Sequence, residues 1–157
     1  MSDITVAIIG AGARGTELYR DTLDHIKNLK IVAICDVNEQ KREELAKMVE
    51  ESGSARPAVY GDYKECLAEV KPQAAVISTA WQKHLEIAEY AMENGVAVAC
   101  EVGGAYSIES LWELVRCYER TKTPVMMMEN CCYGQLELLA LNMKRQGLLG
   151  KIVHCNG

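Results

Sequence analysis

Residues 4–15 read ITVAIIGAGARG, a continuous apolar run that leads into a glycine-rich turn. An uninterrupted apolar run is typical of a strand that is buried on both faces of a parallel sheet. Gly10, Gly12 and Gly15 follow with the spacing G-x-G-x-x-G, and a helical pattern begins directly after them. In that context the three glycines allow a tight turn, close approach of a pyrophosphate, and close packing of helix on strand. The stretch therefore predicts a phosphate-binding turn at a helix N-terminus.

An acidic residue at the end of the second apolar run supports this interpretation. Asp36 follows residues 31–35, near the spacing of about 20 residues after the last glycine that an adenosine ribose requires. Its carboxylate would repel a 2′-phosphate, and Val37 brings no positive charge, so the sequence favours NAD over NADP. The alternative is a glycine turn and a helix-capping aspartate with no ligand.

The whole chain alternates between the two periodicities of strands and helices. This alternation predicts βαβ units and a doubly wound parallel sheet, the Rossmann form of the α/β class. Asn38 and Ser107 are good N-caps for the helices that follow them. Methionines 126–128 are expected to fill the core. The expected strands cover residues 4–9, 31–35, 57–60, 74–78, 96–100, 125–128 and 151–155, and the expected helices cover 14–26, 39–52, 62–70, 84–94, 108–121 and 135–146.

Composition excludes several classes of partner. The 157 residues carry a net charge of −5 with no basic run, which argues against a nucleic-acid partner. No apolar stretch approaches the ~18 residues of a membrane span, and the N-terminus does not resemble a signal peptide. The seven cysteines show no C-x-x-C or zinc-finger spacing. We therefore expect a cytoplasmic protein with reduced thiols and no metal site.

The stretch STAWQKHLEIAEYAMENGVAVACEVGGA, residues 78–105, carries a resemblance. It is similar to the Gfo/Idh/MocA family of NAD(P)-dependent sugar oxidoreductases, in which a Thr-Pro-x-x-x-His turn precedes a helix and a strand then ends in Glu-Lys-Pro. Thr79, Ala80 and His84 occupy the turn here, and Glu101 ends the strand. The arginine of GAGARG, the tryptophan of TAWQKH, the EVGGA turn and MMENCCYG more narrowly resemble glycoside hydrolase family 109, whose members use NAD to cleave α-linked N-acetylgalactosamine.

The motifs and this resemblance together imply a cofactor shell. Asn130, at the end of the sixth expected strand, is expected to hydrogen-bond the nicotinamide or its ribose. Four of these residues have an alternative to a contact with the cofactor. Arg14 could be an exposed surface side chain, and Trp81 could pack within its loop. His84 could pack beneath the turn, and Glu101 could cap the next helix. The expected cofactor-binding residues are Gly10, Gly12, Ala13, Arg14, Gly15, Asp36, Val37, Thr79, Ala80, Trp81, Gln82, Lys83, His84, Glu101, Val102 and Asn130.

Val102 departs from the larger family, because it stands where a lysine commonly assists proton transfer. The resemblance implies an oxidoreductase that moves hydride between NAD and a sugar, with an NAD-dependent glycosidase as the alternative. It also implies a homo-oligomer as the expected assembly. A non-catalytic NAD-sensing module is a further alternative. We expect residues 1–150 to form the Rossmann domain and residues 151–157 to begin a second α/β domain that holds the catalytic groups. The chain by itself is then expected to be inactive.

Overall fold

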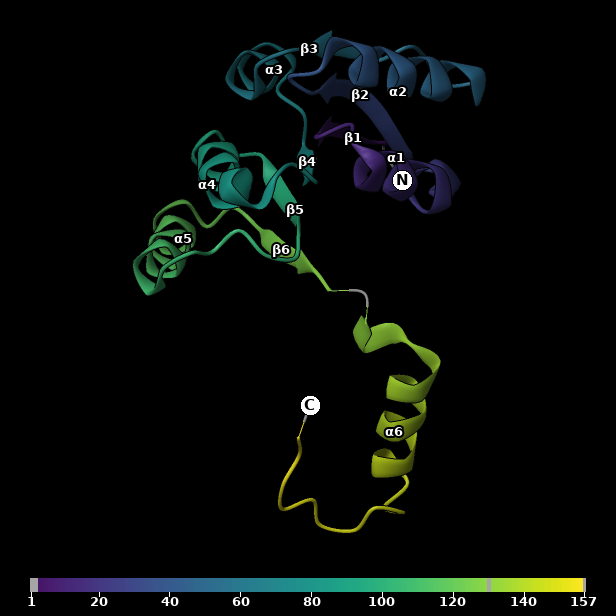
Figure 1. The fold of residues 1–157 in the computed structure, drawn as a ribbon, viewed down its shortest axis with the longest axis vertical. Coiled ribbons are helices and arrows are strands. Elements are labelled where there is room, and N and C mark those ends of the chain that lie inside the picture. Colours follow the sequence, from purple (N-terminus) through teal and green to yellow (C-terminus); the bar gives the residue numbers. More distant parts are fainter. Residues whose placement is uncertain (1–2, 130, 157) are drawn as a thin grey trace.

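The computed structural model describes residues 3–129 and 131–156, and strands and helices alternate along them (Figure 1). Each expected strand up to residue 128 is present, and each is followed by the expected helix. The elements in chain order are β1 (Ile4–Ile9), α1 (Ala13–Asp21), the 3₁₀ turn η1 (Leu23–His25), β2 (Leu29–Cys35), α2 (Glu39–Glu51), β3 (Ala58–Tyr60), α3 (Tyr63–Val70), β4 (Ala74–Ile77), η2 (Trp81–Lys83), α4 (His84–Glu93), β5 (Ala97–Glu101), α5 (Ile108–Thr121), β6 (Val125–Met128), η3 (Cys131–Tyr133) and α6 (Gln135–Arg145).

The strands form one parallel sheet with the order β3-β2-β1-β4-β5-β6. The order reverses at β1, which lies between β2 and β4. Ile9 at the end of β1 pairs with Cys35 of β2 and with Ile77 of β4. The residues that follow these three strands therefore meet at one edge of the sheet, at the switch point where open α/β sheets bind ligands.

Two cores cover the two faces of the sheet, because successive side chains of a strand point to opposite sides. Val6 and Ile8 of β1 belong to one core, with residues of α1 and α2. Ala7 and Ile9 belong to the other, with residues of α3, α4 and α5. Figure 1 shows these two groups of helices on opposite sides of the sheet. The doubly wound Rossmann fold is confirmed.

Side-chain caps begin three of the helices. The side chain of Asn38 accepts a hydrogen bond from the Lys41 N–H, and that of Ser107 accepts one from the Ser110 N–H. Both caps are as expected. Asp62 caps α3 in the same way. Asn38 and Ser107 each satisfy one of the backbone donors that a helix N-terminus leaves free, and Asp62 satisfies two, the N–H groups of Lys64 and Glu65.

Three sequence-based expectations are wrong. Residues 151–155 form no strand: they are exposed and lie beyond α6, away from the sheet and from any partner strand (Figure 1). The first helix ends at Asp21 instead of residue 26, and a 3₁₀ turn replaces its last part. Met126 and Met127 are about 60% exposed instead of filling the core, because β6 is the edge strand of the sheet and no described helix covers these two side chains. Only Met128 packs partly against a core.

Helix α6 stands apart from the sheet (Figure 1). Leu136 of α6 is 76% exposed, and nearly all side chains of this helix face solvent. Within the described ranges, no helix is both long enough and apolar enough to cross a bilayer.

Candidate functional site

The glycine turn after β1 has two crowded positions and one open position. A Cβ on Gly10, whose φ is +104°, would lie 2.6 Å from the carbonyl group of Ser78. A Cβ on Gly15 would lie 2.0 Å from the carbonyl oxygen of Gly10. Gly12 has no atom within 4 Å of such a position. The outer glycines therefore allow strand, turn and helix to pack, and the middle one leaves free space at the N-terminus of α1, where phosphate groups are favoured.

Asp36 lies beside this turn and is hydrogen-bonded to it. Its Oδ2 accepts a hydrogen bond from the Ala11 N–H at 2.7 Å, and its Oδ1 accepts one from the Asn38 N–H at 2.8 Å. Two backbone donors thus fix the carboxylate at the end of β2. A carboxylate has about four acceptor positions, so acceptor capacity remains for the hydroxyl groups of a ribose.

A cleft of about 580 Å³ opens at this edge of the sheet. Its size lies within the usual range for ligand sites. Seven expected residues line it: Gly10, Gly12, Asp36, Val37, Thr79, Ala80 and Lys83. Further lining residues that the sequence reasoning missed include Lys41, Asp62, Tyr63, Lys64, Ser78 and Glu86. Sequence periodicity places these residues at the starts of helices or strand ends, but it gives no sign that they face one cavity.

Glu86 connects two of the side chains at the wall of the cleft. Its Oε2 lies 2.6 Å from Lys83 Nζ, and its Oε1 accepts a hydrogen bond from the Tyr63 hydroxyl at 2.8 Å. These two contacts, that with Lys83 first, lower the pKa of Glu86, so this carboxylate stays charged. Burial raises the pKa of Tyr63, which stays protonated. At this wall the charged Glu86 carboxylate and the neutral Tyr63 hydroxyl therefore form a fixed polar pair.

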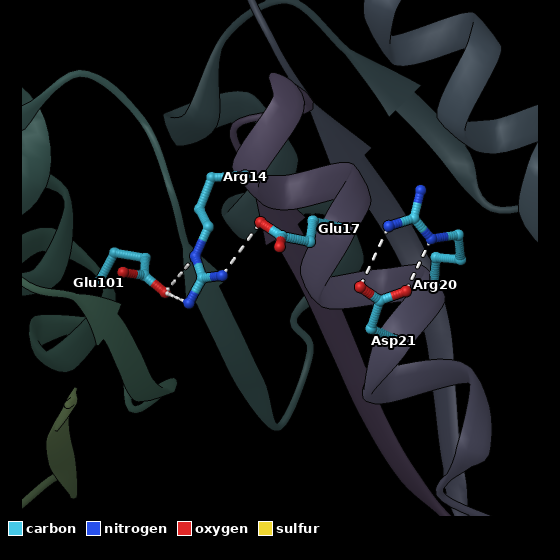
Figure 2. Close-up of polar contacts among 5 residues, drawn as sticks. All are labelled: Arg14, Glu17, Arg20, Asp21 and Glu101. Carbon is cyan, nitrogen blue, oxygen red and sulfur yellow. Dashed lines mark hydrogen bonds and ion pairs between the residues drawn. The ribbon is translucent and has the colours of Figure 1, made fainter. Parts of the chain in front are cut away.

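Arg14 reaches from α1 to the end of β5. Its Nε and Nη2 both lie 2.8 Å from Glu101 Oε1, and its Nη1 lies 3.1 Å from Glu17 Oε2 (Figure 2). A cation in the first turn of a helix is unfavourable next to the helix dipole, and the two carboxylates account for its position here. Glu101 does not cap α5, since Ser107 has that role. Neither Arg14 nor Glu101 is among the lining residues of the cleft.

The turn after β4 brings Trp81 and His84 against the loop after β5. Trp81 is 61% exposed, and a Cβ on Gly103 would lie 3.0 Å from its ring. A Cβ on Gly104 would lie 2.5 Å from His84 Cβ. The two glycines of EVGGA therefore let this loop pack directly on the turn, a contact between segments that the sequence pattern did not indicate.

His84 lies beneath this turn and is fully buried. Its Nε2 is 2.9 Å from the carbonyl oxygen of Thr79, and because a carbonyl only accepts, Nε2 carries the proton. Its Nδ1 has no hydrogen-bond partner among the described residues. This position matches the structural alternative for His84, and direct contact with a cofactor stays a prediction.

The remaining expected residues lie outside the cleft or outside the described residues. Gln82 lines a neighbouring groove between α3, α4 and the start of α5. Ala13 begins α1, and Val102 follows Glu101 on the loop after β5. Asn130, expected to contact the nicotinamide, is not among the described residues. Within residues 3–129 and 131–156, no group of three or more His, Cys, Asp or Glu residues is placed to hold a metal ion.

The cysteines divide into a buried and an exposed group, and all seven are free. Burial raises the pKa of Cys35 and of Cys66 to about 12, and that of Cys100 to about 11. Cys35 lines the cleft, but a thiol that stays protonated is a poor nucleophile. Nucleophilic chemistry by this residue is therefore not supported.

A parallel sheet of this order, with a glycine turn at its switch point and an acid on the next strand, defines a dinucleotide-binding Rossmann domain. Residues 4–129 match the family model described as "Oxidoreductase family, NAD-binding Rossmann fold". The chain belongs to this Gfo/Idh/MocA family, and its Rossmann domain binds NAD.

Curated relatives are similar over the whole chain. A glycosyl hydrolase family 109 protein from Phocaeicola vulgatus is 34% identical over 161 residues, which cover 100% of the chain and 34% of the relative. One from Akkermansia muciniphila is 36% identical over 98% of the chain and 33% of its own length. The chain therefore spans about a third of the length of these relatives.

Solved structures share the fold. The myo-inositol 2-dehydrogenase from Lactobacillus plantarum has a TM-score of 0.84 at 24% identity, covering 97% of the chain and 44% of that protein. The scyllo-inositol dehydrogenase from Lactobacillus casei, crystallised with NAD(H) and scyllo-inositol, has a TM-score of 0.85 at 19% identity, covering 96% of the chain and 43% of that protein.

Proposed function

We propose that the chain binds NAD at the carboxyl edge of the sheet and serves an enzyme that moves hydride between NAD and a sugar or sugar derivative. The observation that carries this proposal is the open space at Gly12 beside the fixed carboxylate of Asp36. The pyrophosphate would lie at the N-terminus of α1, and Asp36 would accept hydrogen bonds from the adenosine ribose. Bound NAD supplies a hydride acceptor and donor.

The preference for NAD over NADP follows from the same carboxylate. A 2′-phosphate would approach the negative charge of Asp36, which two backbone donors hold in place. Val37 is 91% exposed and offers no cation. Lys41 lines the same cleft, but its flexible chain is a weaker constraint than the hydrogen-bonded carboxylate.

The sugar substrate is supported by the names of relatives. The two inositol dehydrogenases of the same fold oxidise polyols, according to their names. Glycosyl hydrolase family 109 proteins at 34–39% identity are among the curated relatives, and their name favours NAD-dependent glycoside cleavage as the second candidate. Val102 supports that candidate, because valine can neither donate nor accept a proton at the position where the larger family commonly has lysine.

The two candidates differ in the fate of the hydride. Net oxidation of a sugar leaves one NADH for each product molecule, whereas glycoside cleavage returns the hydride in the same turnover. The test is an assay of the gene product that contains this chain, with polyols and with aryl glycosides of N-acetylgalactosamine. NADH in proportion to product supports the oxidoreductase, and release of the aryl group without net NADH supports the glycosidase.

A third candidate is a non-catalytic NAD-binding module. It is supported if the protein binds NAD but converts neither the polyols nor the aryl glycosides. The domain division at residue 150, a homo-oligomeric state and a cytoplasmic location also stay predictions.

A further inference from the structure

The Arg14–Glu101 pair joins two segments that are 87 residues apart in sequence. Arg14 lies in the first turn of α1, beside the glycine turn, and Glu101 is the last residue of β5 (Figure 2). Two nitrogens of the guanidinium group meet the same carboxylate oxygen at 2.8 Å. The contact therefore connects the phosphate end of the proposed cofactor site with the strand on the far side of the switch point.

Burial separates Glu101 from the other carboxylate that Arg14 touches. The side chain of Glu101 is 16% exposed, whereas that of Glu17 is 50% exposed. The charge of Glu101 is thus poorly screened by water, and within the described residues Arg14 is its ion-pair partner. At the end of β5 the guanidinium group offsets the negative charge of Glu101, which would otherwise be isolated.

The proposed binding mode decides which part of NAD meets this pair. Asp36 on β2 takes the adenosine end, and the N-terminus of α1 takes the pyrophosphate. Since β1 and β4 follow β2 in the sheet order, the nicotinamide half extends over β4 and β5. The nicotinamide ring is positively charged in NAD⁺ and neutral in NADH. A carboxylate at the end of β5 therefore attracts the oxidised form, and a paired arginine cancels that attraction.

We propose that Arg14 is a positioning residue that holds and neutralises Glu101, and so sets the balance between the affinities for NAD⁺ and NADH. This inference rests on the proposed function. Arg14 then acts on the cofactor through the carboxylate of Glu101, whether or not it also contacts a phosphate group.

The experiment measures the dissociation constants of NAD⁺, NADH and ADP-ribose for the chain and five variants. The variants are R14Q, R14K, E101Q, the double variant R14Q/E101Q and, as the matched control, R20Q. Arg20 is on the same helix and pairs with Asp21 at 2.6 Å, but both side chains are more than half exposed (Figure 2). ADP-ribose lacks the nicotinamide ring and reports general damage to the site.

The expected result is opposite in sign for the two single variants. R14Q leaves Glu101 unpaired, so NAD⁺ binds more tightly relative to NADH. The ratio of the NADH dissociation constant to the NAD⁺ dissociation constant rises about tenfold, a size typical of one poorly screened charge. E101Q lowers the ratio by about threefold, a smaller shift because Glu17 still neutralises part of the charge of Arg14. R14K and R20Q keep the ratio of the unmodified chain, and the double variant returns close to it because both charges are gone.

Provided that the unmodified chain binds NAD⁺, two results overturn the inference. The ratio of the two dissociation constants stays unchanged in R14Q and E101Q, or it shifts in the same direction in both variants. If R14Q does not fold, the isosteric E101Q and the charge-preserving R14K still test it. Failure of the unmodified chain to bind both NAD⁺ and ADP-ribose is a different outcome, and it removes the proposed function itself.

Discussion

Asp36 Oδ2 accepts a hydrogen bond from the Ala11 N–H at 2.7 Å, so the acid of β2 directly holds the glycine turn of β1. Its second oxygen is bound by the Asn38 N–H at the start of α2. The carboxylate is therefore oriented before any ligand arrives. A preoriented acceptor loses less conformational freedom when it binds, which favours affinity.

Replacing Asp36 is expected to weaken NAD binding and to reduce the discrimination against NADP. In D36A the ribose loses its acceptor and the 2′-phosphate loses its repulsion, so NAD affinity falls about tenfold or more while NADP affinity falls less. Titration calorimetry with both dinucleotides measures the change. The control is E39Q, which removes a charge from the 81% exposed side chain of Glu39 nearby. Equal losses for both dinucleotides would contradict the assignment of Asp36.

The glycine turn predicts a separation of stability from binding. G15A is expected to destabilise the fold by several kcal/mol, because its Cβ would lie 2.0 Å from the carbonyl oxygen of Gly10. G12A has space for its Cβ and is expected to change the free energy of unfolding by about 1 kcal/mol or less. Its methyl group nevertheless occupies the place of the pyrophosphate, so NAD affinity falls. Thermal unfolding and NAD titration of both variants check this, and NAD binding by a stable G12A variant at full strength would contradict it.

Sequence patterns predicted the parts of this fold that depend on neighbours along the chain. The apolar runs located all six strands, and Asn38 and Ser107 marked the starts of their helices. The expected strand at residues 151–155 failed because a strand exists only with a partner, and a local pattern cannot show whether a partner is present. The exposure of Met126 depended in the same way on β6 lying at the edge of the sheet.

The candidate site shows the same limit. The spacing of Gly10, Gly12, Gly15 and Asp36 is a local signal, and these residues meet at one edge of the sheet. The pairing of Arg14 with Glu101 spans 87 residues and depends on how α1 is placed relative to β5. No periodicity in the sequence encodes such a contact.

Thiol accessibility is expected to follow burial. At neutral pH a thiol reagent should modify Cys131, Cys132 and Cys155 in the folded chain and all seven cysteines only after unfolding. Cys131 should react more slowly than Cys155, because its hydrogen bond with Glu129 raises its pKa and lowers the thiolate fraction. Mass spectrometry of the labelled chain gives both results. Rapid labelling of Cys35 or Cys66 in the folded state would contradict the described core.

Alkaline pH is expected to destabilise the fold through the same buried thiols. The folded pKa of Cys66 is about 12, above its ordinary value of 9.0, so the unfolded chain loses this proton first. The stabilising contribution is fully present below pH 9 and is lost as pH rises toward about 12. Each such thiol lowers the free energy of unfolding by about 1.4 kcal/mol per pH unit in this window.

Comparison of C66A with C155A isolates this contribution. Denaturant unfolding between pH 8 and pH 11, about 1 unit below and 2 units above the ordinary thiol pKa, should show a shallower pH dependence in C66A. C155A alters an exposed thiol and should keep the slope of the unmodified chain. Identical slopes for C66A and C155A would count against the raised pKa of Cys66.

A crystal structure of the chain with NAD⁺ is the most direct test of the central claim that the glycine turn and Asp36 hold the dinucleotide. The account predicts the pyrophosphate beside Gly12 at the N-terminus of α1, the adenosine ribose on the carboxylate of Asp36, and the nicotinamide half over β4 and β5. Electron density for NAD⁺ elsewhere on the molecule, with the space at Gly12 empty, would contradict it.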